Sequence, residues 1–330
     1  MTTYKALKGK KIKYFTSDPP AAVAEGQVWY NSANQEYKSS VKVKAWASGG
    51  NLTAARSTGG GAGTQTAGLY AGGQTPPGPG TVNSEEYNGT AWTEGNNINT
   101  GRYEIGGITA GTQTAGLIFG GNTSPGWNGV NATEEYNGTS WSNGEAMATT
   151  VSFLSGSGIQ TAAFSAGGRT PSNTNNSQEY DGTDWTNGNN INTTRQALVG
   201  VGTQTAGMVA GGESPGGGSN ASETYDGTNW TTGPNMGTAR YRLSGSGSVY
   251  TASLVFGGRF NPPAADKAQT ESFDGTSWTE EGDLATARQQ LSGNRGTSTA
   301  ALAVGGLTTA KVASTEEFSA AAIVKTITDS

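Results

Sequence analysis

The chain contains 330 residues, of which 33% are hydrophobic, 14% are charged and 53 are glycine, and its formal net charge is −5. Globular chains usually carry roughly 45–50% apolar residues, in a count that includes glycine, and about 25% charged residues. Because glycine here takes the place of larger apolar side chains, we expect many thin layers between small sheets and no single large core. Cysteine and histidine are both absent, which excludes disulfides, thiol nucleophiles, histidine-based triads and zinc sites that need these ligands.

The first 40 residues differ from the rest of the chain. Residues 1–50 contain eight lysines and three acids, whereas the remainder contains twelve basic and twenty-two acidic residues. Two short strand-like pieces, 11–15 and 27–30, flank Pro19-Pro20 and are too short for an independent core. We therefore expect an attachment arm over residues 1–40, with a solvated tail as the alternative. Its assembly contact would use the aromatic residues Tyr14, Phe15, Trp29 and Tyr30.

Neither a membrane span nor a secretory signal is expected. No apolar run approaches the roughly 18 residues that a spanning helix needs, and the opening MTTYKALKGKKIKYF has no apolar core region.

From residue 41 onward the chain is a repeat. A Gly-Gly pair closes an apolar run six times, at 44- to 48-residue intervals, at Gly72, Gly120, Gly167, Gly211, Gly257 and Gly305. Tryptophans keep the same rhythm at Trp46, Trp92, Trp141, Trp185, Trp230 and Trp278. Ten residues after the tryptophan stands an arginine, at Arg56, Arg102, Arg195, Arg240 and Arg288, except in the third unit, which has Val151.

Each unit is predicted to form four short strands, a to d. In the second unit strand a covers 103–109, strand b covers 114–119, and strand c ends in Glu-Glu-Tyr before an Asn-Gly turn. Asn-Gly and Asp-Gly are strong hairpin signals because both central residues tolerate positive φ. A period of 44–48 residues with four strands per unit indicates the blades of a β-propeller.

The six Gly-Gly units predict six blades. The last unit lacks its turn and tryptophan, while residues 40–46 (SVKVKAW) alternate like a strand and end in an unpartnered tryptophan. We therefore expect a propeller domain over 41–330 whose ring is closed by strand 41–46, which removes exposed strand edges. The alternative closes the last blade with residues 321–328.

The pattern of apolar run, Gly-Gly, Tyr-(Asp/Asn), Trp and Arg resembles the Kelch repeat over about residues 46–319. The chain is also similar in texture to Kelch-like structural proteins of marine bacteriophages, of the cyanophage and pelagiphage type. In addition, the segment Glu25-Gly-Gln-Val-Trp-Tyr-Asn-Ser resembles a motif near the N-termini of phage tail and fibre proteins. The resemblance implies an all-β, six-bladed Kelch-like β-propeller with a short non-repeat N-terminal arm.

The repeated residues are expected to be structural because they recur in every unit. We expect the tryptophans to wedge between neighbouring blades. The repeated arginines should be buried and bonded to carbonyl groups or to the acids of strand c, which are Glu85, Glu134, Glu179, Glu223, Glu271 and Glu316.

Variation is concentrated in the loops after Gly-Gly, which share one face of a propeller with the d–a connections. Loops on a rigid scaffold are where binding specificity tends to lie, although drift in surface loops is the alternative. The candidate ligand-binding residues, of types that favour interface hot spots, are Trp127, Arg169, Arg259 and Phe260.

These observations predict a non-enzymatic, tail-associated knob or fibre-type component of a phage virion, with possible receptor or glycan binding. Its expected partners are other virion proteins, through the arm, and a host glycan or receptor. No catalytic residues, cofactor, metal or nucleic acid are expected, since no carboxylate pair, Ca²⁺ loop, phosphate cradle or basic face stands out. The alternatives are a capsid decoration protein, a cellular Kelch-type interaction module and a carbohydrate-active propeller enzyme.

Overall fold

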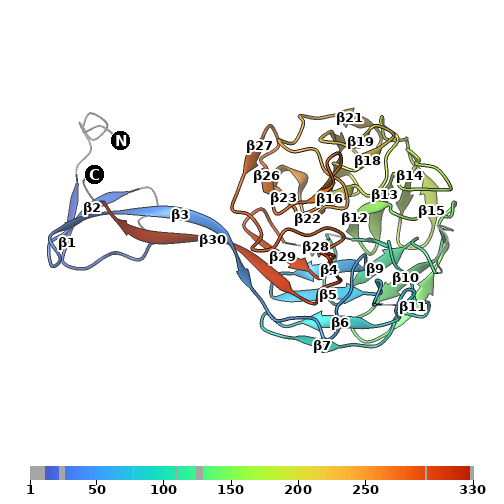
Figure 1. The fold of residues 1–330 in the computed structure, drawn as a ribbon, viewed down its shortest axis with the longest axis horizontal. Coiled ribbons are helices and arrows are strands. Elements are labelled where there is room, and N and C mark those ends of the chain that lie inside the picture. Colours follow the sequence, from blue (N-terminus) through green and yellow to red (C-terminus); the bar gives the residue numbers. More distant parts are fainter. Residues whose placement is uncertain are drawn as a thin grey trace. The chain divides into compact units, whose positions relative to one another are not determined.

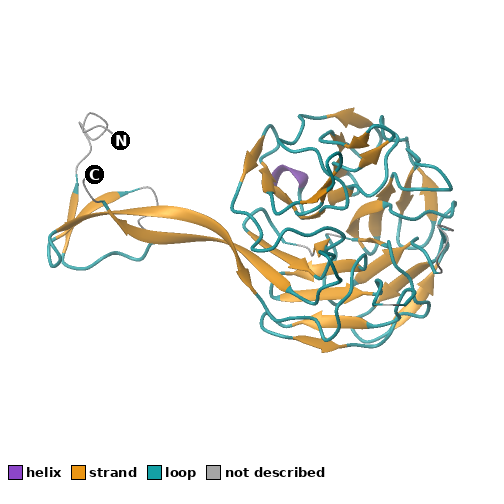
Figure 2. Cartoon of the chain, viewed as in Figure 1, coloured by secondary structure: helices purple, strands orange, loops and turns teal. Residues whose placement is uncertain are grey.

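The computed structural model describes residues 12–21, 27–76, 78–108, 110–123, 129–293 and 296–327. Its described part is all-β apart from one 3₁₀ turn, η2 (Tyr250–Ala252), as Figure 2 shows. The chain divides into two compact units, of which unit 1 contains residues 1–44 and 319–330 and unit 2 contains residues 45–318. The division differs from the predicted one, because residues 319–330 group with the arm and the arm extends to residue 44.

Unit 2 is a multi-bladed β-propeller built from short antiparallel sheets. Figure 1 shows these sheets arranged around a common centre. Five have four strands each. The first contains β4 (Gly60–Thr64), β5 (Ala67–Ala71), β6 (Ser84–Tyr87) and β7 (Trp92–Glu94). The second contains β8 (Gly106–Gly107), β9 (Gly116–Phe119), β10 (Thr133–Tyr136) and β11 (Trp141–Gly144). The third contains β12 (Ser155–Ile159), β13 (Ala162–Ala166), β14 (Ser177–Tyr180) and β15 (Trp185–Asn187).

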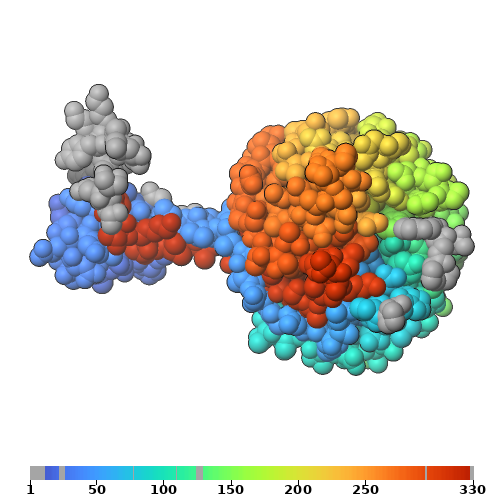
Figure 3. Space-filling view, in the orientation of Figure 1, coloured from blue at the N-terminus to red at the C-terminus, as the bar shows by residue number. Residues whose placement is uncertain are grey.

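The fourth sheet contains β16 (Val199–Thr203), β17 (Ala206–Ala210), β20 (Ser222–Tyr225) and β21 (Trp230–Thr232). The fifth contains β22 (Ser244–Ser246), β23 (Ser253–Phe256), β26 (Thr270–Phe273) and β27 (Trp278–Glu280). Two small hairpins, β18 (Glu213–Ser214) with β19 (Gly217–Gly218) and β24 (Arg259–Phe260) with β25 (Ala265–Asp266), lie in b–c loops. Sheets that are consecutive in sequence are neighbours in space, as the colours in Figure 3 show.

A six-stranded sheet joins the two ends of the chain. Its strands follow the order β1 (Lys13–Phe15), β2 (Val28–Asn31), β3 (Glu36–Ser48), β30 (Thr315–Thr326), β29 (Ala300–Val304) and β28 (Ser292–Gly293). Within unit 2, β3 lies beside β30 as the tryptophan strand lies beside strand c elsewhere. The Trp46 ring packs on Phe256 and Phe318 with centroids 4.8 and 5.2 Å apart. Residues 321–326 continue β30 and do not form a separate strand.

The inner strands of unit 2 approach one another backbone to backbone. A Cβ atom added to Gly293 would lie 2.1 Å from the carbonyl oxygen of Gly245, and one added to Gly200 would lie 3.0 Å from that of Gly156. Side chains at these positions would push neighbouring sheets apart. Glycine is therefore required here by close approach, which explains part of the unusual composition.

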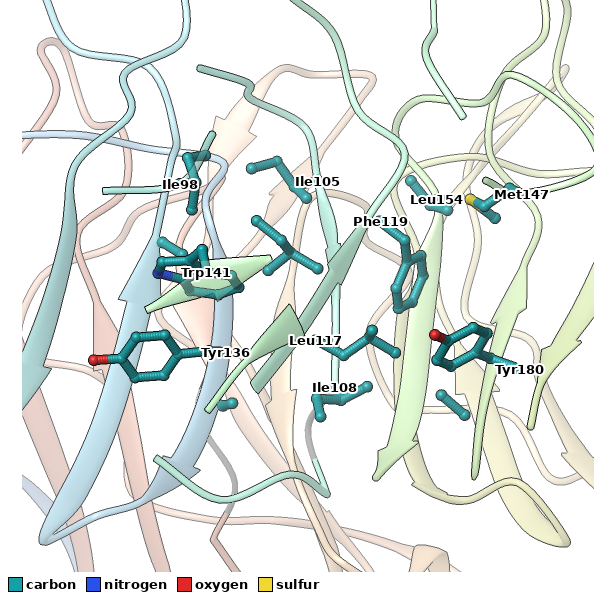
Figure 4. Close-up of a cluster of buried hydrophobic side chains, with 14 of the residues drawn as sticks. Ile98, Ile105, Ile108, Leu117, Phe119, Tyr136, Trp141, Met147, Leu154 and Tyr180 are labelled. Carbon is teal, nitrogen blue, oxygen red and sulfur yellow. The ribbon is translucent and has the colours of Figure 1, made fainter. Parts of the chain in front are cut away.

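Aromatic side chains fill the space between neighbouring sheets, as predicted for the tryptophans. Trp185 Nε1 donates to Thr133 Oγ1 of the preceding sheet at 2.9 Å, and its ring lies edge-on to Phe119 at 4.9 Å. Figure 4 shows the core around this junction, where Phe119, Leu154 and Tyr180 gather from successive sheets. Each junction is a thin apolar layer, in agreement with the low hydrophobic content.

Unit 1 is a small sheet in which β1 pairs in parallel with β2, and β2 pairs antiparallel with β3. Trp29 is 1% exposed, and its Nε1 donates to Asp18 Oδ1 at 3.0 Å. Asn31 Nδ2 donates to the same oxygen at 2.8 Å. The ring of Trp29, one of the four aromatic residues predicted to supply the assembly contact, is therefore buried within the arm.

Candidate functional site

One position in each sequence repeat of unit 2 has a backbone conformation that side-chain-bearing residues rarely adopt. It lies two residues after the repeated arginine position, and its φ is between 51° and 60°. The residues are Thr58, Glu104, Phe153, Ala197, Arg242 and Gln290, which we call the mouth ring. Non-glycine residues in the left-handed region cost of order 1–3 kcal/mol each and gather at functional sites.

Backbone hydrogen bonds connect the members of the mouth ring around the axis of unit 2. The amide of Gln290 donates to Arg242 O at 2.9 Å, and the amide of Thr58 donates to Gln290 O at 2.9 Å. The amides of Arg242 and Ala197 donate at 2.8 Å to Ala197 O and Phe153 O. Phe153 N donates to Glu104 O at 3.3 Å, and Ile105 N donates to Thr58 O at 3.4 Å. Every repeat is thus linked to the next. This cycle of bonds compensates for the strained φ angles.

The mouth ring surrounds a cavity of about 120 Å³ that continues between the inner strands. Because one water molecule needs roughly 10–15 Å³ of such volume, the space holds several waters or one small ligand group. Its deeper lining is mostly glycine and serine backbone, including Gly107, Gly156 and Gly200. The cavity-lining side chains that differ most from repeat to repeat therefore lie at the mouth.

Glu104 is the acidic member of the mouth ring and is 8% exposed. The Asn122 side-chain amide donates a short hydrogen bond to Glu104 Oε2. Burial raises the pKa of Glu104 to about 7, although the Asn122 bond and the charges of Arg242 and Arg169 act in the opposite direction. The carboxyl group therefore exchanges a proton near neutral pH.

Arg242 is the basic member of the ring. Its guanidinium carbon lies 5.7 Å from the ring centroids of both Phe153 and Tyr241, distances at which a cation and an aromatic face attract. Its Nη1 donates to Gln289 Oε1 at 3.2 Å. Phe153, Ala197 and Tyr241 form a small buried apolar cluster at this end of the axis. The mouth thus combines an acid, a cation and an aromatic patch.

A second set of variable residues lies directly outside the mouth ring. Each follows a Gly-Gly pair and is bridged to the residue just before a mouth-ring residue, as in Ser152 with Arg169 and Tyr241 with Arg259. The six residues are Gln74, Asn122, Arg169, Glu213, Arg259 and Leu307. The structure thus brings the predicted Arg169 and Arg259 to equivalent positions around one axis.

The remaining predicted loop residues have separate outcomes. Arg169 Nε donates to Pro171 O at 2.8 Å, and Arg259 forms a 3.3 Å ion pair with Asp266. Phe260 is half-buried, and Lys267 Nζ lies 5.6 Å from its ring centroid. Trp127 lies outside the described residues.

Sequence reasoning missed Glu104, Phe153 and Arg242. Their signal was available, because the position two residues after the repeated arginine reads Thr, Glu, Phe, Ala, Arg and Gln through the six units. Such chemical divergence at one fixed repeat position is unlike the uniformity of the neighbouring glycines and tryptophans.

The repeated arginines are structural, as predicted. Arg102 is fully buried, and its Nη2 lies 2.8 Å from Glu134 Oε1. Its Nη1 donates to Gly120 O and Ala132 O at 3.0 and 2.7 Å, so it ties the start of the second sheet to its Gly-Gly pair. Equivalent ion pairs join Arg56 with Glu85, Arg195 with Glu223, Arg240 with Glu271 and Arg288 with Glu316.

The predicted set of strand-c acids is wrong at one position, which lies in the third sheet. The residue at the ion-pair position of β14 is Gln178, not Glu179, and it accompanies Val151 in place of arginine. Gln178 Oε1 accepts a bond from Ala148 N at 2.8 Å, as Glu134 Oε2 does from Asn99 N at 2.6 Å. Glu179 instead accepts a short hydrogen bond from the Tyr225 hydroxyl of the next sheet.

Among the described residues, no three Asp, Glu, His or Cys side chains are grouped so that they could hold a metal ion. No helix of the described part is long and apolar enough to cross a bilayer.

Comparison with known proteins shows the fold alone. No protein-family model matches the chain, and neither does any curated protein. Among solved structures, the chain is similar to that of YjhT, with a TM-score of 0.68 and 13% sequence identity, over 83% of this chain and 99% of the other. At this identity the similarity supports a β-propeller and carries no function across.

Proposed function

We propose that this chain is a non-enzymatic structural protein of a bacteriophage particle, tail-associated, whose propeller presents a receptor- or glycan-binding face. In this proposal the propeller has six Kelch-like blades, and the sixth consists of β28, β29 and the unit-2 parts of β30 and β3. The arm, unit 1, attaches the protein to other virion proteins. Its location is the virion.

The observation that carries the binding role is the chemical divergence of the mouth ring within a uniform scaffold. The buried arginine, tyrosine and tryptophan positions repeat from sheet to sheet, whereas the mouth positions carry an acid, a cation, an aromatic ring and an amide. A scaffold that keeps its core fixed and varies one axial face is suited to recognition. Arg242, Phe153 and the adjacent Tyr241 also belong to the arginine and aromatic types that are enriched in binding interfaces.

The virion role is supported by the sequence of the arm. Residues 27–32, within the segment that resembles phage tail and fibre proteins, form β2 and the start of the turn after it. The charge difference between the basic N-terminal region and the acidic remainder suits an arm that docks on one partner while the propeller faces another. Complementary charge accelerates such docking and sets its register.

The binding role is tested with labelled full-length protein on host cells. We expect Arg259→Ala and Phe260→Ala, both beside the mouth ring, to weaken binding by about tenfold or more, the effect of losing one interface anchor. Asp184→Asn, in an exposed c–d turn, is the matched control and should bind as the unmodified protein does. If the unmodified protein does not bind host cells, or if all three variants bind as well as it does, the proposed recognition face is wrong.

A further inference from the structure

Exposed apolar side chains are concentrated in unit 1. The described residues include six large hydrophobic side chains that are exposed, and four of them belong to this small unit. They are Tyr14, Tyr37, Ile323 and Ile327, with exposed fractions of 73, 46, 38 and 45%. A clustered apolar patch of this kind marks an interaction site more often than scattered single residues do.

The strand registers place these residues on one face of the arm sheet. Tyr14 lies opposite Tyr30, and Tyr30 lies opposite Tyr37. Their ring centroids are 5.5 and 5.1 Å apart. Ile327 N donates to Tyr37 O at 2.8 Å, which extends the row across β3.

The same face continues along β3 and β30. Side chains two or four residues apart on a strand share a face. Val41 therefore lies on the same face as Tyr37, and Ile323 lies on the same face as Ile327. The antiparallel register that joins Tyr37 with Ile327 places Ile323 opposite Val41. We call this surface the tyrosine face: Tyr14, Tyr30, Tyr37, Val41, Ile323 and Ile327.

The opposite face of the arm sheet is already occupied. Phe15, Trp29 and Asn31 point to that side, where Asp18 accepts hydrogen bonds from Trp29 and Asn31. The four aromatic residues that the sequence grouped as one contact are therefore divided between two faces. Only Tyr14 and Tyr30 lie on the open face.

We propose that the tyrosine face is the docking surface of the arm, and that its occupant is a second protein with an apolar centre and an acidic rim. The proposal rests on the proposed function, which gives the arm its attachment role. Among the described residues, unit 1 holds five lysines against the two carboxylates Asp18 and Glu36. The strand registers place Lys325 on the tyrosine face, without a described carboxylate beside it, and the other four lysines on the opposite face of the sheet. An acidic rim complements this excess of positive charge, and aromatic side chains supply the buried centre.

The same charges disfavour a second copy of the arm. A pair of arms would bring two units of like net charge together, with Lys325 facing its own copy or nearby apolar residues, which opposes association. A bilayer would accept the tyrosines and lysines at its surface, so it serves as an alternative outcome of the test.

The test installs the photoreactive residue p-benzoylphenylalanine at Tyr37 or Ile323 of the full chain, in cells that produce the particles. Position Lys42, exposed on the other face of β3, is the control. Cross-linked peptides are identified by mass spectrometry. A parallel set, Tyr37→Ser, Ile327→Ser and Lys42→Ser, is scored for incorporation into purified particles, with near-ultraviolet circular dichroism to verify that the Trp29 environment is retained.

We expect Tyr37 and Ile323, but not Lys42, to cross-link to one other protein through a peptide rich in Asp and Glu. Tyr37→Ser and Ile327→Ser should reduce incorporation at least tenfold, while Lys42→Ser stays within twofold. Cross-links to a second copy of this chain, to no protein, or to a peptide without acids overturn the proposal. The proposal is also overturned if the full chain floats with phosphatidylcholine–phosphatidylserine vesicles and Tyr37→Ser abolishes this flotation.

The two proposals fail separately. If the unmodified chain is absent from particles, the virion role is wrong and the cross-links alone decide the tyrosine face. If the chain is present and the face variants are incorporated normally, the virion role stands and the tyrosine face is wrong.

Discussion

The Tyr180 hydroxyl donates to Glu135 Oε1 at 2.5 Å, across the junction between the third and second sheets of the propeller. The same bond joins Tyr136 to Glu86 and Tyr87 to Glu317. Where phenylalanine replaces the tyrosine, at Phe273 and Phe318, the preceding sheet has Thr224 or Ser272 in place of glutamate. Both partners change together, so no buried donor or acceptor is left without its counterpart.

This pairing makes the junction testable by a double-mutant cycle. Tyr180→Phe removes the donor and should lower the free energy of unfolding by about 1.5–3 kcal/mol, as expected for a hydrogen bond to a charged group. Adding Glu135→Thr recreates the Phe273–Thr224 combination and should recover part of the loss. Urea unfolding of the four proteins measures the coupling. Strict additivity of the two single changes would show that the pair does not interact.

The buried ion pair that recurs in every sheet of unit 2 except the third allows a similar comparison. Arg102→Val alone leaves Glu134 buried without its cation and should cost about 3–5 kcal/mol. The double variant Arg102→Val/Glu134→Gln copies the natural Val151–Gln178 pair and should recover most of that loss. Thermal unfolding with calorimetry gives the values. If the double variant were no more stable than the single one, the third sheet would need another source of stability.

Glu104 gives the stability a dependence on pH. Its pKa is about 7 in the folded protein, above the ordinary 4.5, so between these values the folded state binds the proton more tightly than the unfolded chain does. The contribution of Glu104 to the free energy of unfolding is therefore fully present below pH 4.5 and is lost as the pH rises through 7, by on the order of 3 kcal/mol. Glu104→Gln should remove this loss. Melting temperatures from pH 4 to 8 that change in parallel for both proteins would contradict this assignment.

The pairing of β3 with β30 predicts how the chain tolerates truncation. Removing residues 1–46 deletes Trp46 and most of β3, so β30 loses its neighbour and the ring its closing strand. We expect the melting temperature of the whole propeller to fall sharply. Removing residues 1–35 takes away β1 and β2 but keeps β3, and serves as the control. Equal melting temperatures for the two shortened chains would show that β3 does not close the ring.

Much of the fold could be predicted because each repeat encodes the same sheet. The Asn-Gly and Asp-Gly turns appear as expected, with Asn88 Oδ1 accepting from Thr90 N at 2.9 Å. Among the described residues of the predicted strand 103–109, Gly106 and Gly107 alone pair with β9, while Thr109 lies outside the described part. Glycine-rich backbone forms short ladders whose ends the sequence pattern does not mark.

The candidate site was predicted less completely, for two physical reasons. Glu179 was grouped with the ion-pair acids by its charge, although its distance from Tyr180 places it at the junction position. Glu104 and Arg242 lie in connections where hydrophobic periodicity says nothing, and their role comes from a backbone conformation. The division of Tyr14 and Trp29 between two faces depended on a parallel pairing of β1 with β2, which their short sequences do not specify.

We propose a virion component whose mouth ring faces outward, and an electron cryo-microscopy map of the assembled particle decides between this arrangement and its reverse. We expect propeller density at the surface of the particle, with the mouth ring and the loops after Gly-Gly in solvent and unit 1 in contact with a neighbouring protein. A particle without this propeller, or one in which the mouth ring is buried while unit 1 is free in solvent, would show that the proposal is wrong.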